Sequence, residues 1–121
     1  MVYTGYFSRV KKYTEADLIP ISIARYSPKW WNYDTCSLLA PTSGLLMRYK
    51  AGKVNPEEYE REYREYLDNI NVKAILENLI PGKRNIILCC YEKPGDFCHR
   101  HIFADYVFEH FGIKMEEYII K

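Results

Sequence analysis

The run NIILCC at residues 85–90 is the feature that most constrains the fold of this chain. Its length suits a strand, and its residues show no alternation of polar with apolar side chains, so we expect both of its faces to be covered. Strands of this kind lie inside parallel sheets that carry helices on both faces. The run therefore predicts the central strand of a three-layer-like α/β domain, with a mostly parallel sheet and flanking helices.

Other segments supply further elements for such a sheet. Residues 2–7 and 18–25 are rich in apolar, β-branched or aromatic side chains and predict two more strands, and residues 114–120 predict an edge strand. Residues 11–17 are polar and are expected to form a connection. Residues 26–41 show no clean period and predict a long irregular loop, a kind of segment that often carries function.

Helix signals are strongest after Asn55, which can cap a helix whose first turn holds a proline and two acids. Gly112 is placed to end the last predicted helix. Helices are predicted at residues 43–50, 56–70, 72–79 and 97–111. A chain of 121 residues without an internal repeat is the size of one domain, so we predict a single domain over residues 1–121.

Composition limits the classes of partner. A net charge of +1 at pH 7 gives no basic excess for binding nucleic acid, and the cluster Arg9, Lys11 and Lys12 is too short to supply one. We find neither an apolar stretch long enough to cross a bilayer nor a signal peptide, so we expect a cytoplasmic protein without a membrane partner. In that reducing compartment the cysteines are expected to be thiols. They are Cys36, Cys89, Cys90 and Cys98.

Residues 86–101 (IILCCYEKPGDFCHRH) concentrate the groups that can carry chemistry. The pattern predicts a strand, a turn and a helix, and ligands of open α/β sheets bind beyond the carboxyl ends of strands. A helix that begins there offers free N–H groups and a partial positive charge. We expect Asp96 to cap this helix and Cys98, His99 and Arg100 to occupy its first turn.

Functional roles follow from these residue types. Cys98 would be a nucleophile or a ligand contact, because a helix N-terminus lowers the pKa of a thiol. His99 would be an acid or base near neutral pH, and Glu92 a general base. Arg100 would bind a phosphate or carboxylate through two parallel hydrogen bonds.

Structural alternatives remain open for the same side chains. Cys90 can simply pack in the core, and Cys98 can be an inert thiol near the helix end. His99 shares a helix face with aromatic residues and can be a hydrogen-bonded core histidine. Arg100 can pair with Glu92 or with an aspartate in the preceding turn.

Two familiar cysteine sites do not fit the spacing. A cysteine phosphatase or rhodanese loop needs an arginine six residues after its nucleophile, but these positions hold Asp96 and Ala104. A zinc site would have to combine irregularly spaced residues. The candidates are Cys89 or Cys90 with Cys98, His99 and His101. We therefore expect neither a metal nor another cofactor.

The motifs Cys90-Tyr91-Glu92 and Cys98-His99-Arg100 resemble the hallmark of the domain of unknown function 488 (DUF488) family. The resemblance extends to Tyr3-Thr4 in the first strand and to Arg25, which a proline follows three residues later. It departs from the family at Ile23, where many members have an aspartate two residues before that arginine. The resemblance covers most of the chain and implies an α/β fold and a shared site, without an established activity.

The leading hypothesis is an enzyme that acts on a small anionic or nucleotide-like ligand, with the tryptophans stacking on a flat ligand. The side chains predicted to form the site are Cys90, Glu92, Cys98, His99, Arg100, Arg25, Trp30 and Trp31. One alternative is a sensor that binds an anionic metabolite without changing it. Another is an interaction module that binds a partner protein through exposed Trp and Tyr side chains.

Overall fold

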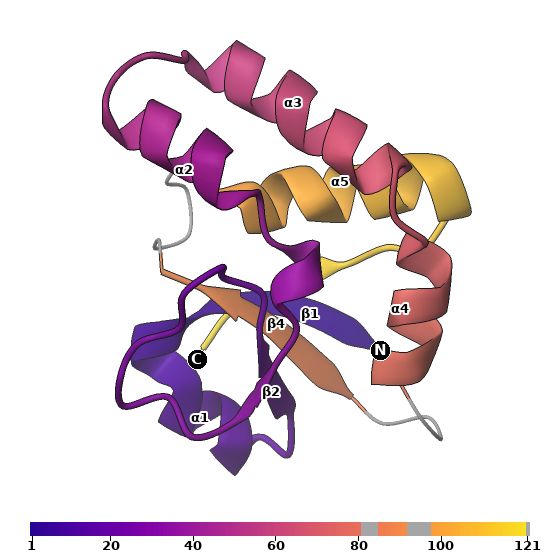
Figure 1. Cartoon of the computed structure of the whole chain (residues 1–121). Helices are drawn as coiled ribbons and strands as arrows, with labels where there is room; N and C mark the ends of the chain where they lie inside the picture. The colour runs from indigo at the N-terminus through magenta and orange to yellow at the C-terminus, as the bar shows by residue number, and fades with distance from the viewer. Residues whose placement is uncertain (81–84, 92–97, 121) are drawn as a thin grey trace.

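A computed structural model of the chain describes residues 1–80, 85–91 and 98–120. The strands in these ranges form one parallel sheet in the order β3-β2-β4-β1-β5 (Figure 1). The strands are β1 (Val2–Tyr6), β2 (Ile19–Ser22), β3 (Asp34–Thr35), β4 (Ile86–Cys90) and β5 (Glu116–Glu117). The predicted α/β fold with a parallel sheet and β4 at its centre is therefore confirmed.

Helices cover both faces of this sheet. The helices are α1 (Val10–Glu15), α2 (Ser43–Lys50), α3 (Pro56–Asp68), α4 (Val72–Leu79) and α5 (His99–Phe111). Figure 1 shows α2, α3, α4 and α5 on one side of the sheet and α1 on the other. Two short 3-10 helices, Phe7–Arg9 and Ser37–Leu39, lie in the connections. None of the helices in the described ranges is long and apolar enough to span a membrane.

The core is divided by β4, whose five residues are all buried. Ile86 and Leu88 belong to the larger apolar cluster, which contains residues of α3, α4 and α5. Ile87 and Cys89 belong to the smaller cluster on the other face, together with Tyr13 of α1. Alternate residues of β4 thus face opposite cores, which explains why the sequence shows an unbroken apolar run there.

Predicted helix ends agree well with the structure. Asn55 forms a capping box with Glu58: the Asn55 side chain accepts from the Glu58 N–H at 2.8 Å, and the Glu58 carboxylate accepts from the Asn55 N–H at 3.2 Å. Gly112 ends α5 in the left-handed region, at φ 68°. The capping residues therefore identified these ends correctly.

The prediction that residues 11–17 form only a connection was wrong, since they contain most of α1. Val10 and Tyr13 are three residues apart and both buried, so a single apolar face stabilises this short helix. The other side chains of this helix are polar, so the sequence pattern did not indicate a helix with an apolar face. The predicted loop at residues 26–41 is also less irregular than expected, because it contains β3 and the 3-10 helix Ser37–Leu39.

Candidate functional site

Two cysteines meet where β4 ends and α5 begins. Cys90 is the last residue of β4, and Cys98 is the N-cap residue of α5 rather than part of its first turn. The structure pairs their sulfur atoms in a disulfide, so the expectation of thiols was wrong for this pair. The two cysteines are eight residues apart in the sequence, and this spacing alone did not indicate that their sulfur atoms would be bonded. Cys36 and Cys89 are free, and burial raises the pKa of Cys89 to about 12.

His99 is buried directly beside this pair. Its Nε2 lies 2.7 Å from the carbonyl oxygen of Ile23, and its Nδ1 lies 4.0 Å from Cys98 Sγ. A carbonyl only accepts hydrogen bonds, so Nε2 carries the hydrogen and the neutral ring has its lone pair on Nδ1. Burial lowers the pKa of His99 to about 4, although the bond to Ile23 opposes this shift. The ring is therefore neutral at pH 7.

Arg100 lies behind the cysteines, with no exposed surface. Its Nη1 donates to Cys90 Sγ at 2.8 Å. Its Nε and Nη2 each donate to one carboxylate oxygen of Glu117, at 3.0 Å in both cases. Arg100 thus links α5, β4 and β5, and it is not among the residues that line the pocket described next.

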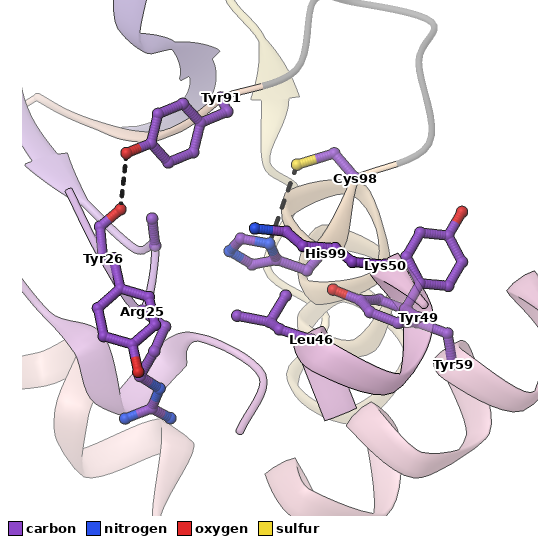
Figure 2. A pocket seen from close by; sticks show the side chains of 10 residues that line it. Arg25, Tyr26, Leu46, Tyr49, Lys50, Tyr59, Tyr91, Cys98 and His99 are labelled. Atoms are coloured by element: carbon purple, nitrogen blue, oxygen red, sulfur yellow. Dashed lines mark hydrogen bonds between the residues drawn. The ribbon is translucent and has the colours of Figure 1, made fainter. Parts of the chain in front are cut away.

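A pocket of about 350 Å³ opens next to Cys98 and His99 (Figure 2). The described residues that line it are Ala24, Arg25, Tyr26, Leu46, Tyr49, Lys50, Tyr59, Tyr91, Cys98 and His99. They include two cations and four tyrosines, and none of them is a carboxylate. A ligand in this pocket would therefore meet positive charge, aromatic rings, a sulfur atom and a neutral imidazole.

Each wall of the pocket comes from a different part of the chain. Arg25 follows β2 and donates to the carbonyl oxygens of Pro41 at 3.1 Å and Ala40 at 3.3 Å, which holds the segment before α2 in place. Figure 2 shows Tyr26 and Tyr91 on one side of the cavity, where the Tyr91 hydroxyl donates to the Tyr26 carbonyl at 2.8 Å.

The opposite wall is formed by α2 and α3. Leu46, Tyr49 and Lys50 are spaced three and four residues apart and share one face of α2, and Tyr59 of α3 packs against Tyr49 with ring centroids 4.8 Å apart. His99 and Cys98 lie between the two walls in Figure 2. The pocket thus lies beyond the carboxyl ends of β2 and β4, the location that the parallel sheet predicted.

The predicted site residues fall into four groups. Arg25, Cys98 and His99 line the pocket, and Cys90 and Arg100 lie directly behind Cys98.

Trp30 and Trp31 do not line the pocket: Trp30 is exposed, and Trp31 packs on Phe7 with ring centroids 4.8 Å apart. Glu92 lies outside the described residues, as does Asp96, the predicted cap of α5.

Several pocket residues were not predicted from the sequence. Tyr91 follows β4 directly, so the rule that ligands bind beyond strand ends could have found it. Lys50, Tyr49 and Leu46 carry no such signal, because they reach the pocket only through the packing of α2 against the rest of the fold. Glu117 was missed for the same reason, since pairing of β5 with β1 brings it to Arg100.

Comparison with known families gives one assignment. The family DUF488-N3a, described as the active DUF488-N3 subclade, matches residues 6–110. No curated protein and no solved structure matches the chain. The matched range contains both motifs and every described residue of the pocket, whereas Glu117 lies beyond it.

Proposed function

The chain belongs to the DUF488 family, and on this premise we propose that it is an enzyme that acts on a small anionic, nucleotide-like ligand bound beside Cys98 and His99. The observation that carries the proposal is the character of the pocket lining, in which two cations and four tyrosines surround a sulfur and an imidazole. A cavity of about 350 Å³ is the size of a site for a small molecule.

The charge of the lining supports an anion. Arg25 donates two hydrogen bonds to neutral carbonyl oxygens, so these contacts do not cancel its positive charge. Lys50 is exposed at the pocket and forms no ion pair with any described residue. Two cations without a carboxylate among the described lining residues attract phosphates or carboxylates.

The aromatic side chains support a ligand with a planar part. Tyr26, Tyr49, Tyr59 and Tyr91 border the cavity from both walls. Tyrosine rings offer apolar faces for stacking and hydroxyls for hydrogen bonds, which suits a heterocyclic base attached to an anionic group. In this proposal the tyrosines take the stacking role that the sequence had suggested for Trp30 and Trp31.

Cys98 and His99 would supply the reactive groups. In the reduced state the Cys98 sulfur can contact a bound ligand directly, and the neutral Nδ1 of His99 beside it can accept a proton. Arg100 is assigned a positioning role here, because it contacts the Cys90 sulfur and Glu117 instead of lining the pocket.

A thermal-shift screen with nucleotides and phosphorylated metabolites tests the binding step. Ligands that bind the native state raise its melting temperature. We expect Lys50→Glu to abolish the shift, whereas Lys53→Glu, a change of the same charge on an exposed lysine outside the pocket lining, should retain it. Equal shifts in both variants, or no shift with any compound in the wild type, would contradict the proposal.

The catalytic step needs a separate measurement on each compound that binds. Incubation of the reduced protein with the compound, followed by product analysis, should show turnover that Cys98→Ser removes while Cys36→Ser retains it. Cys36 is a matched control, because it is a free thiol that does not line the pocket. A ligand recovered unaltered from the wild type would instead identify a sensor.

A further inference from the structure

We propose that Cys90, Cys98 and His99 form a three-ligand site for a thiophilic divalent cation, for which Zn²⁺ is the test ion. The Sγ atoms of the two cysteines and a ring nitrogen of His99 all lie within 4.8 Å of one another, and all three residues are buried. The inference goes beyond the proposed function, because the binding of a metal by these atoms does not require an anionic ligand.

The separation of His99 from Cys98 suits one small metal ion, and the two sulfurs, which are bonded to each other here, have to move apart after reduction. Two ligand atoms on a tetrahedral Zn²⁺ lie about 3.5 to 3.8 Å apart, given typical Zn–S and Zn–N distances. His99 Nδ1 and Cys98 Sγ are 4.0 Å apart, so a change of less than about half an ångström brings them to bonding positions.

The orientation of His99 is that of a metal ligand. Its Nε2–H donates to the Ile23 carbonyl at 2.7 Å, so Nδ1 presents its lone pair toward Cys98. Histidines that bind metals almost always donate their other ring N–H to a carbonyl, carboxylate or water, which fixes the tautomer and the direction of the ring. Here the backbone after β2 supplies that partner.

Arg100 supports the Cys90 end of the site. Its Nη1 donates a hydrogen bond to Cys90 Sγ at 2.8 Å, which holds that sulfur in position. The carboxylate of Glu117 binds the other side of the same guanidinium and balances its charge. The group behind the site is therefore an ion pair and not an isolated cation. An incoming divalent cation therefore meets little net repulsion from this side.

The backbone spacing also favours a metal between the sulfurs. The Cα atoms of Cys90 and Cys98 are 7.6 Å apart, beyond the range of about 4.4 to 6.8 Å that is usual for disulfides. A metal ion holds two sulfurs farther apart than a disulfide does, so it accommodates wider backbone spacing. The reduced pair is thus better matched to a metal than to a covalent bond.

Metal binding requires that the disulfide is first reduced and that the two resulting thiols then lose their protons. A thiol or phosphine reductant first supplies two electrons to the disulfide, and two protons come from the thiol reductant or, with a phosphine, from the water that converts it to its oxide, which gives two thiols. Zn²⁺ then replaces both thiol protons and takes the His99 lone pair, with release of two protons to solvent. Cys98 and His99 line the pocket, so the fourth position of a tetrahedral ion would be open toward the pocket, as in zinc sites that keep a water or substrate ligand.

The test is a metal titration of the full chain, reduced with a phosphine and freed of metal by a chelator. We expect stoichiometric binding of Zn²⁺, and with Co²⁺ as a spectroscopic probe the visible bands of tetrahedral coordination together with a thiolate charge-transfer band. Cys98→Ser and Cys90→Ser should each weaken Zn²⁺ binding by more than about tenfold, whereas Cys36→Ser should not change it.

A second readout on the wild type makes the test independent of variant folding. Bound Zn²⁺ should protect Cys90 and Cys98 from alkylation and leave the labelling of the half-buried Cys36 unchanged. Lys50→Glu should bind Zn²⁺ normally, so failure of the anion site and failure of the metal site give different results. A reduced wild type that binds no stoichiometric Zn²⁺, or that gains no protection at the two cysteines, would overturn the proposal.

Discussion

The guanidinium of Arg100 on α5 holds the carboxylate of Glu117 on β5 through two hydrogen bonds of 3.0 Å. The Arg100 side chain has no exposed surface, and that of Glu117 is 17% exposed. Thr4 of β1 donates to the same carboxylate at 2.7 Å. This ion pair therefore joins the edge of the sheet to the helix that begins at the candidate site, and it leaves the third arm of the guanidinium for Cys90.

Glu117→Gln should destabilise the protein strongly, because it leaves the Arg100 charge buried without its counter-charge. Removing one member of a buried pair costs about 3–5 kcal/mol. Urea unfolding of the variant and the wild type measures the difference. Glu116→Gln is the matched control, since Glu116 is exposed and its ion pair with Lys114 should contribute less than about 1 kcal/mol. Equal unfolding curves for the two variants would show that the Arg100–Glu117 pair adds nothing.

Gly5→Ala should also destabilise the fold, for a steric reason. A Cβ at this position would lie 2.7 Å from atoms of the buried Tyr13 ring and from Cδ1 of Ile87. Overpacking of this kind costs about 1–3 kcal/mol. Gly44→Ala in α2 meets nothing within 4 Å and should stabilise the protein by about 0.5–1 kcal/mol. Thermal unfolding should therefore move in opposite directions for the two variants, and a shift in the same direction would refute the packing argument.

Leu46→Trp should fill the pocket and remove ligand binding without unfolding the protein. Leu46 lines the cavity and is only partly buried, so a larger side chain can extend into the open volume instead of into the core. Met47→Trp is the control, because Met47 is its neighbour on α2 but is 70% exposed and lies outside the lining. Any compound that shifts the melting temperature of the wild type should still shift that of Met47→Trp. A retained shift in Leu46→Trp would place the ligand elsewhere.

Stability should fall at alkaline pH because of Tyr13. Burial raises the pKa of Tyr13 to about 12 from an ordinary value of 10.0. Between these pH values the native state keeps a proton that the unfolded chain loses, so the free energy of unfolding decreases as pH rises. The contribution is complete below about pH 10 and is lost by about pH 12. Burial also raises the pKa of Tyr63, which acts in the same direction.

Tyr13→Phe tests this pH dependence. The variant should be less stable at neutral pH, because the N–H of Tyr6 loses the hydroxyl that accepts its hydrogen bond at 3.2 Å. Its free energy of unfolding should then fall less steeply above about pH 10 than that of the wild type. Urea unfolding across this pH range gives both slopes, and parallel slopes would exclude Tyr13 as the source.

The fold was predictable wherever the residues of a short segment indicate by themselves that it is buried or that a helix begins or ends there. The apolar run of β4 shows burial on both faces, and Asn55 and Gly112 mark helix ends through local backbone chemistry. By contrast, α1 is held by only two buried side chains, and the two-residue strand β3 exists because β2 offers it a partner. Elements that depend on distant contacts leave little trace in their own sequence.

Some residues of the pocket were named from the sequence for the same reason. Cys98 and His99 follow a central strand, so the topology rule for parallel sheets leads to them. Cys90 and Cys98 were predicted to lie in one site, but the spacing of eight residues did not indicate that their sulfur atoms would be bonded. Lys50 reaches the pocket from another helix, so no local pattern could have revealed it.

The alternation of β4 has a consequence for the chemistry at its end. Even-numbered residues of the strand, Ile86 and Leu88, face α5, and Cys90 continues that series toward Arg100. Inserting one residue earlier in this strand would reverse the parity and direct Cys89 toward Arg100 in its place. Which of two adjacent cysteines meets the guanidinium is thus decided by whether its position in the chain is odd or even.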